Sequence, residues 1–317
     1  MVKKILTKFI VFLCALVSVF YVFGCQNAQN PTVMSGSEVY DAYRSSVVEV
    51  IAGAKSGTAF VVDSVDGKVV LATAYHVTGY DDSKVQFRFF GSDTFVGGAS
   101  VIGYDVKHDV AFFEIDYSQT VKKVDGFSQA NAGEKVYAIG NADGEGVSIV
   151  DGIISVKEEV VKYGASNFFK PLIRTSARIS SGNSGGLLVS ESGKVVGMTV
   201  ASDELNYSKN YALPISLLNA LYNRVKQNKR NAQVRYPSFS LISEDVSVGE
   251  SIKKINTVTL CGKTFTFDGG LYDVSEDKHY TAINGKNFST ITSLVEGIIG
   301  IDGEGAVLSG ADGELTV

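Results

Sequence analysis

Three short segments contain residue types that can do nucleophilic and acid–base chemistry. His76 ends an apolar β-type run, Asp109 opens another, and Ser184 lies in the glycine-rich stretch 182–186. A serine hydroxyl is a weak nucleophile at neutral pH, so it needs a base within hydrogen-bonding reach and a third group to orient that base. We therefore expect His76 to accept the Ser184 proton and a buried Asp109 to hold the other ring nitrogen.

The same glycine-rich stretch can supply backbone donors. We expect the N–H groups of Gly182, Asn183 and Ser184 to form an oxyanion hole, because glycine permits the backbone angles that expose an N–H. Each piece alone has a plain structural explanation, as a strand-end histidine, a solvated turn aspartate or a simple loop. The three together, in this order and in a β-rich chain, indicate a catalytic triad.

At these residues the chain resembles trypsin-like serine proteases of the chymotrypsin fold, and within them the bacterial HtrA/Deg type. The resemblance covers about residues 38–229, and the spacing of the three residues also suits that family. Its motifs are Thr73-Ala74-Tyr75-His76, Asp109-Val110-Ala111, Ile139-Gly140-Asn141, Gly152-Ile153-Ile154-Ser155 and the stretch from Thr175 to Val189.

The resemblance implies an all-β fold: two antiparallel six-stranded β-barrels with the triad in the cleft between them, followed by a C-terminal helix. It also implies that Arg178, six residues before Ser184, lies at the base of a specificity pocket whose walls include Thr199 and Ala201. A buried guanidinium needs a partner. Arg178 would pair either with a carboxylate of the following loop (Asp203 or Glu204) or with an acidic side chain of the substrate.

The elements that must position these residues are mostly short strands between turns, with hairpin turns at 65–67 and 192–193. Apolar spacing predicts one long helix at 216–229 and a short one at 37–45. The expected strands are 46–52, 58–62, 68–73, 84–90, 110–115, 135–139, 146–157 and 194–201.

Composition narrows the class of protein. The 317 residues are 45% hydrophobic and carry a net charge of −5, which argues against intrinsic disorder and against duplex or other nucleic-acid binding. Three histidines are too few for a histidine-rich metal site, so we expect no metal and no cofactor. By strand alternation, His108 points away from Asp109 and reads as a surface or packing residue.

The N-terminus resembles an export signal. Three lysines precede the apolar run 9–23, and Gly24-Cys25 follows, as in a bacterial lipoprotein signal. We expect residues 1–24 to be removed, which takes the net charge from −5 to −8, and Cys25 to carry lipid that holds the protein on the outer side of the membrane. An uncleaved membrane anchor is the alternative. Cys261 then remains alone, so no internal disulfide is expected.

The remaining chain divides by composition. Residues 25–37 read as a flexible tether, 38–230 as the protease domain, and 236–317 as a small β-rich domain of unknown role. HtrA proteins usually carry a PDZ domain at that position, so the alternatives are a PDZ-like domain and an unrelated one. The expected partners are protein or peptide substrates, and the oligomeric state is open. The competing function is a catalytically silent, protein-binding lipoprotein.

Overall fold

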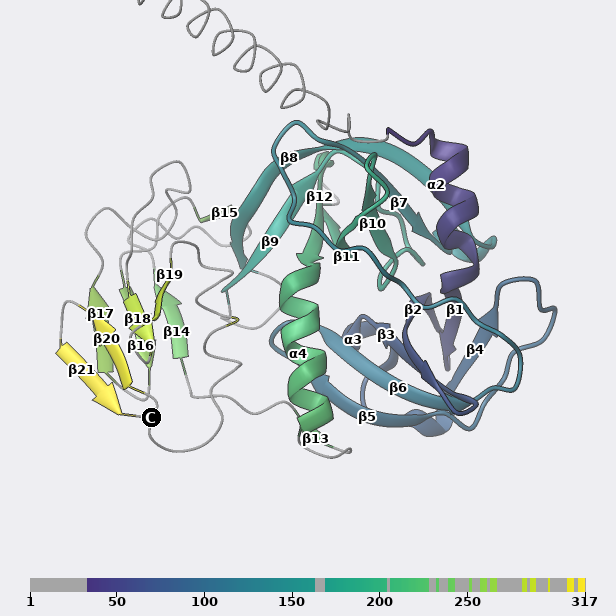
Figure 1. The fold of residues 1–317 in the computed structure, drawn as a ribbon, viewed down its shortest axis with the longest axis horizontal. Helices are drawn as coiled ribbons and strands as arrows, with labels where there is room; N and C mark the ends of the chain where they lie inside the picture. The colour runs from purple at the N-terminus through teal and green to yellow at the C-terminus, as the bar shows by residue number, and fades with distance from the viewer. Residues whose placement is uncertain are drawn as a thin grey trace, which may run out of the picture. The chain divides into compact units, whose positions relative to one another are not determined.

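A computed structural model of the chain describes residues 33–162, 169–203 and 206–227, and short segments between 232 and 316. The expected signal peptide, the Cys25 lipidation site and most of the tether lie outside these residues. Within the described part, no helix is both long and apolar enough to cross a membrane. Two sheets make up most of this part, one built from β1–β6 and one from β7–β12 (Figure 1).

The first sheet has the strand order β5-β6-β3-β2-β1-β4, with antiparallel neighbours and β13 along the outer edge of β5. Among the described residues no pairing joins β4 to β5, so a closed first barrel stays a prediction. The strands are β1 (Val47–Ala52), β2 (Lys55–Val65), β3 (Lys68–Thr73), β4 (Val85–Phe89), β5 (Ser100–Asp105) and β6 (Val110–Asp116).

The second sheet closes on itself. Its order is β8-β7-β10-β11-β12-β9, and β8 also pairs with β9, which completes a ring of antiparallel strands and confirms one of the two expected barrels. The strands are β7 (Lys135–Gly140), β8 (Ser148–Lys162), β9 (Phe169–Thr175), β10 (Leu187–Ser190), β11 (Val195–Asp203) and β12 (Asn206–Pro214).

The strands described beyond residue 230 are short. They pair as β14-β16-β17 and as β19-β18-β20-β21, while β15 lies beside β8. The role and the fold of residues 236–317 therefore stay predictions. Their bounds are β13 (Ala232–Gln233), β14 (Phe239–Ile242), β15 (Ser251–Ile252), β16 (Thr257–Leu260), β17 (Lys263–Thr266), β18 (Thr281–Ile283), β19 (Lys286–Phe288), β20 (Val307–Gly310) and β21 (Gly313–Thr316).

The first described helix, α2 (Gly36–Tyr43), begins at a capping box. The Ser35 hydroxyl accepts from the backbone N–H of Glu38 (3.3 Å), and the Glu38 carboxylate accepts from the N–H of Ser35 (2.7 Å). Its buried Tyr43 hydroxyl donates to the carbonyl of Gly193 (2.8 Å) at the β10–β11 turn. The expected helix at 37–45 is thus confirmed with slightly earlier bounds, and its last residues form a 3₁₀ turn (Arg44–Ser46).

The long helix α4 (Ile215–Gln227) follows β12 directly and joins the two sheets. Its Tyr222 ring lies 5.3 Å from the ring of Phe112 on β6, centroid to centroid, and the Tyr222 hydroxyl donates to Asp63 Oδ2 (3.2 Å) on β2. A buried cluster runs through this seam and contains residues of both sheets and of α4. The helix expected at 216–229 is confirmed for residues 216–227, and residues 228 and 229 lie outside the described part of the chain.

We expect Phe112→Ala to lower the free energy of unfolding by about 3–5 kcal/mol, because the ring is fully buried in the cluster that joins both sheets and α4. Urea unfolding measures this. Phe127→Ala is the matched control, since Phe127 is 47% exposed and its loss should change stability by less than about 0.5 kcal/mol. Equal losses in the two variants would contradict this description of the core.

Candidate active site

His76 lies on a single turn of helix, α3 (Tyr75–Thr78), just after β3. Its backbone N–H donates to Asp109 Oδ1 (2.8 Å), and its ring Nδ1 lies 2.7 Å from Asp109 Oδ2. The N–H of Tyr75 donates to the backbone carbonyl of Asp109 (3.1 Å). The two residues are therefore fixed together by backbone and side chain, with the imidazole 42% exposed and the carboxylate 5% exposed.

Asp109 occupies the turn between β5 and β6 in a left-handed backbone conformation, with φ at +62°. Aspartate tolerates this region better than most residues do. Because residues 108 and 109 are in a turn, the alternation argument for His108 does not apply. His108 is fully buried, and its Nδ1 lies 2.7 Å from Asp105 Oδ2, so it forms a buried polar pair rather than a surface residue.

Asp105, the last residue of β5, has a carboxylate that organises this turn. Oδ1 accepts from the N–H groups of Lys107 (2.8 Å) and His108 (3.2 Å). Burial by itself would raise the pKa of Asp105, but His108 beside it and these hydrogen bonds hold that pKa below its usual value. The turn thus contains two nearly buried carboxylates, Asp105 and Asp109, each bonded to a histidine ring.

Ser184 lies in the loop that leads into β10. Gly182 and Gly185 there have φ of +87° and +88°, and a Cβ would collide with the Asn141 carbonyl at Gly182 and with the Thr58 carbonyl at Gly185. Both positions therefore require glycine. The Ser184 hydroxyl donates to the Val200 carbonyl (3.4 Å), and no hydrogen bond joins it to His76 among the described residues.

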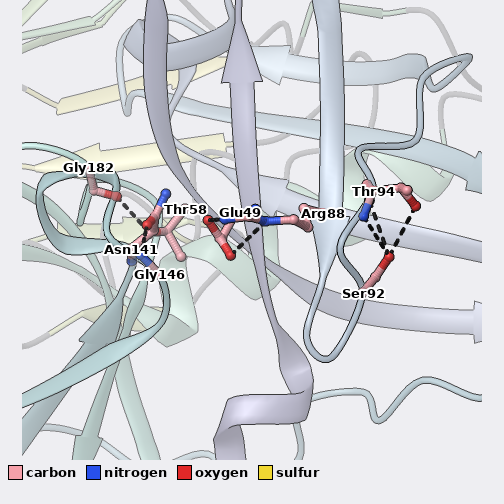
Figure 2. A network of polar contacts seen from close by, with 8 residues as sticks. All are labelled: Glu49, Thr58, Arg88, Ser92, Thr94, Asn141, Gly146 and Gly182. Carbon is pink, nitrogen blue, oxygen red and sulfur yellow. Dashed lines mark hydrogen bonds and ion pairs between the residues drawn. The ribbon is translucent and has the colours of Figure 1, made fainter.

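Thr58 on β2 joins the Ser184 loop to the first sheet (Figure 2). Its hydroxyl donates to the Gly182 carbonyl (2.7 Å) and accepts from the Asn141 N–H (2.8 Å). The Thr58 N–H donates to the Ser184 carbonyl (2.9 Å), a contact that the figure does not draw. On the adjacent Gly57, a Cβ would lie 2.8 Å from the Val77 side chain and 3.2 Å from the Ser184 carbonyl. Gly57 of β2 therefore lies against both the Ser184 loop and the helical turn that carries His76, with no room for a side chain between them.

The backbone N–H groups of the Ser184 loop differ in whether they have a hydrogen-bond acceptor. Asn183 donates its N–H to the Ser180 carbonyl (3.1 Å), whereas those of Gly182 and Ser184 have no acceptor among the described residues. The Ser181 carbonyl accepts from the Asp143 N–H (2.6 Å). A trans peptide points its C=O and N–H in opposite directions, so this bond turns the Gly182 N–H away from Asp143.

The residues expected at the specificity pocket do not share one environment. Arg178 is exposed. Thr199 is buried, and its hydroxyl donates to the Asn183 carbonyl (2.5 Å), so it supports the Ser184 loop. Ala201 is partly buried against the core. The side chains of Asp203 and Glu204, the expected partners of Arg178, lie outside the described residues.

Three residues at the site escaped sequence reasoning: Thr58, Asp105 and Lys170. The threonine reads as an ordinary β-branched strand residue, and the aspartate as a turn former. Lys170 on β9 is 1% exposed, and burial lowers its pKa to about 8 against the opposing effect of Asp109 and Asp105. In the sequence, the one sign of this group of charged residues is that Asp105 and Asp109 lie four positions apart.

We expect Thr58→Val to lower the free energy of unfolding by about 1–3 kcal/mol, because the similarly shaped side chain leaves the buried Gly182 carbonyl and the Asn141 N–H without the hydroxyl. Thr58→Ser keeps the hydroxyl and should lose less. Chemical denaturation of both variants checks the order. A valine variant as stable as the serine variant would show that the hydroxyl does not hold the loop.

The chain is similar in sequence to known serine proteases. Residues 57–198 match the sequence family described as a trypsin-like peptidase domain. The chain is 29% identical over 209 residues to a probable periplasmic serine endoprotease DegP-like of Rickettsia conorii, covering 64% of this chain and 40% of that protein. It is 31% identical over 216 residues to the serine protease Do-like HtrB of Bacillus subtilis, covering 65% and 45%. The chain thus spans less than half the length of these two relatives.

Solved structures resemble the chain in fold. The serine endoprotease from Yersinia pestis has a TM-score of 0.57 at 19% identity, covering 90% of this chain and 96% of that chain. A protease from M. tuberculosis in its active form has a TM-score of 0.51 at 20% identity, covering 62% and 86%. In sequence, residues 57–198 of this chain are therefore similar to trypsin-like peptidase domains.

Proposed function

We propose that this chain is a serine endopeptidase that hydrolyses peptide bonds with His76, Asp109 and Ser184. The observation that carries the proposal is the paired hydrogen bonding of His76 to a nearly buried Asp109, with the Ser184 loop bonded to neighbouring strand β2. A buried carboxylate on Nδ1 orients an imidazole and stabilises its protonated form. The protease domain then corresponds to residues 38–230.

In the proposed reaction the Ser184 hydroxyl leaves the Val200 carbonyl and turns to His76, which removes its proton as Oγ attacks the substrate carbonyl. The protonated imidazole then gives this proton to the leaving amine, and an acyl-enzyme remains on Ser184. Water, activated by the same imidazole, releases the acyl group and restores the serine.

The negative charge on the substrate oxygen needs preorganised donors. We assign this role to the N–H groups of Gly182 and Ser184, which have no acceptor among the described residues, and not to Asn183, whose N–H is bonded to Ser180. The hydrogen bond from Asp143 to the Ser181 carbonyl supports this assignment, because it fixes the peptide plane that carries the Gly182 N–H.

The pocket assignment remains a proposal in which Arg178 pairs either with a carboxylate of the following loop, Asp203 or Glu204, or with an acidic side chain of the substrate. A planar guanidinium forms paired hydrogen bonds with a carboxylate. Ala201 stays a proposed wall of the pocket, whereas Thr199 is assigned to the support of the Ser184 loop.

A fluorophosphonate probe tests the nucleophile. We expect labelling of the wild-type chain and none of Ser184→Ala, because the probe forms a covalent bond only with an activated serine. Ser181→Ala is the matched control, since Ser181 is an exposed serine in the same loop and its variant should still be labelled. A folded wild-type chain without labelling would support the silent, protein-binding alternative instead.

We also propose that the protein is exported and held at the membrane by lipid on Cys25, and acts there on protein substrates in quality control. The motif at Gly24-Cys25 supports anchoring, and the periplasmic names of the relatives support export. A diacyl modification provides two chains, which suffices for stable anchoring. Mass spectrometry of the mature N-terminus should find a lipidated Cys25. A retained Lys3, as an uncleaved anchor would leave, or an unmodified terminus beyond residue 25 would refute the lipid anchor on Cys25.

A further inference from the structure

A lysine of the first sheet is bonded to the backbone of the proposed base. Lys55 is the first residue of β2, and its Nζ donates to the His76 carbonyl (2.7 Å). Lysine side chains can hydrogen-bond the last carbonyls of a helical turn, and here that turn is α3, which carries His76. Because Lys55 is exposed, its ammonium is held beside the site and stays accessible from solvent.

The direction of the Lys55 side chain follows from Gly57, two residues along β2. A Cβ on Gly57 would lie 2.8 Å from the Val77 side chain and 3.2 Å from the Ser184 carbonyl, so this face of β2 is turned to α3 and to the Ser184 backbone. The pairing of β1 with β2 is regular from Lys55 onward, and residues two apart share a face of a regular strand. Lys55 therefore lies on the same face, about 7 Å along the strand from Gly57, at the edge of the proposed site.

The ammonium of Lys55 has donors to spare. Within the described part of the chain, Lys55 forms no ion pair with a carboxylate, and the His76 carbonyl is its one hydrogen-bond acceptor. A lysine ammonium has three N–H donors, so two remain for a ligand. Its positive charge is therefore available to a negatively charged group that enters the site.

The acidic side chains of the site are directed elsewhere. Asp109 is 5% exposed, and its two carboxylate oxygens face the N–H and the ring of His76. The exposed acids Asp143 and Glu145 belong to the loop after β7, whose first N–H is bonded to the hydroxyl of Thr58 (Figure 2). Thr58 follows Gly57 directly, so that loop meets the opposite face of β2 from Lys55.

The proposed reaction determines which part of a substrate meets Lys55. Ser184 lies between β11 and β2, because its hydroxyl donates to a carbonyl of β11 and its own carbonyl accepts from the N–H of Thr58. The residue before the cut is assigned to the pocket beside Ala201 on β11. The leaving amine receives its proton from His76, so the residues that follow this amine lie on the β2 side, next to Lys55.

We propose that Lys55 is a specificity-determining residue that binds an aspartate or glutamate side chain among the first few substrate residues after the cut. The inference rests on the proposed function and names its substrate class, peptides that are acidic on the leaving-group side. A hydrogen bond between an ammonium and a carboxylate is stronger than one between neutral groups. The bond to His76 also holds the ammonium in place beforehand, which reduces the entropy lost on binding.

Cleavage of matched peptides tests this specificity. The residue before the cut is kept constant, and a single Asp, Asn or Lys is placed at the first, second or third position after it. At one of these positions we expect kcat/KM at low salt to be about 3–10-fold higher for Asp than for Asn. High salt should reduce this preference, because it screens exposed charges. The preference should appear in KM with kcat unchanged, as for an interaction made equally in the ground and transition states.

Charge variants distinguish recognition of the substrate from support of the turn. Lys55→Glu should reverse the order, so that the Lys peptide is cleaved faster than the Asp peptide, and Lys55→Arg should keep the wild-type order. Lys84→Glu is the matched control: Lys84 is exposed, and its carbonyl accepts from the N–H of Gly53 (3.4 Å) beside the β1–β2 turn, but its side chain has no bond to His76. It should keep the wild-type order. If Lys55 only supported α3, Lys55→Glu would slow all peptides equally and leave their order unchanged, which would overturn the inference.

Peptide binding to Ser184→Ala separates this inference from the proposed function. In that background, fluorescence anisotropy should show tighter binding of the Asp peptide than of the Asn peptide, and the added Lys55→Met substitution should remove the difference. Equal affinities for the two peptides would overturn the inference about Lys55. A wild-type chain that neither cleaves nor reacts with fluorophosphonate, but whose Lys55-dependent preference in binding persists, would overturn the proposed function alone.

Discussion

The site depends on one threonine that reaches across the two sheets. Thr58 belongs to β2 of the first sheet, yet its hydroxyl and N–H bind the loop of the second sheet at Gly182 and Ser184. Its carbonyl in turn accepts from the Thr73 hydroxyl (2.6 Å), at the end of the strand that leads to His76. A buried polar group must find partners, and here those partners are the two segments that the proposed chemistry has to bring together.

The glycines of the loop also allow it to pack closely against β2 and Asn141. Gly185 approaches the Thr58 backbone so closely that a Cβ has no room, and Gly182 approaches Asn141 in the same way. Thr199 closes the loop from the opposite strand through the Asn183 carbonyl. The position of the Ser184 backbone is thus determined from three directions by neutral hydrogen bonds, while the charged groups are gathered on the β5–β6 turn.

The sequence predicted those helices and strands whose apolar residues recur at a regular spacing and whose ends carry turn-forming residues. Strand β3 has the predicted bounds, Lys68–Thr73, and the turn at Asp66-Gly67 has positive φ at both residues, as a tight hairpin requires. Among β1–β12, four strands were not predicted. Strands β5, β9 and β12 mix polar or turn-forming residues with apolar ones, and β10 is four residues long and follows the glycine-rich loop directly.

Residues of the candidate site could be predicted where the chemistry requires a particular residue type. They could not be predicted where their surroundings arise only when the chain folds. His76 and Asp109 are recognisable because few side chains can act as a base and its orienting acid. Lys170 was not, since a lysine in a strand ordinarily indicates an exposed position. His108 is buried, so the packing alternative holds and the surface one does not; the strand alternation used to place it fails because residues 108 and 109 lie in a turn with a left-handed Asp109.

That left-handed backbone also limits what the chain can accept at residue 109. A β-branched or bulky side chain is strained at a φ of +62°, while asparagine, like aspartate, adopts the conformation readily. Exchange of one carboxylate oxygen for an amide nitrogen is therefore the change that this turn tolerates with its backbone unaltered. Under the proposed mechanism, a single Asp109→Asn substitution would therefore remove the carboxylate that orients His76 and leave the backbone of the turn unaltered.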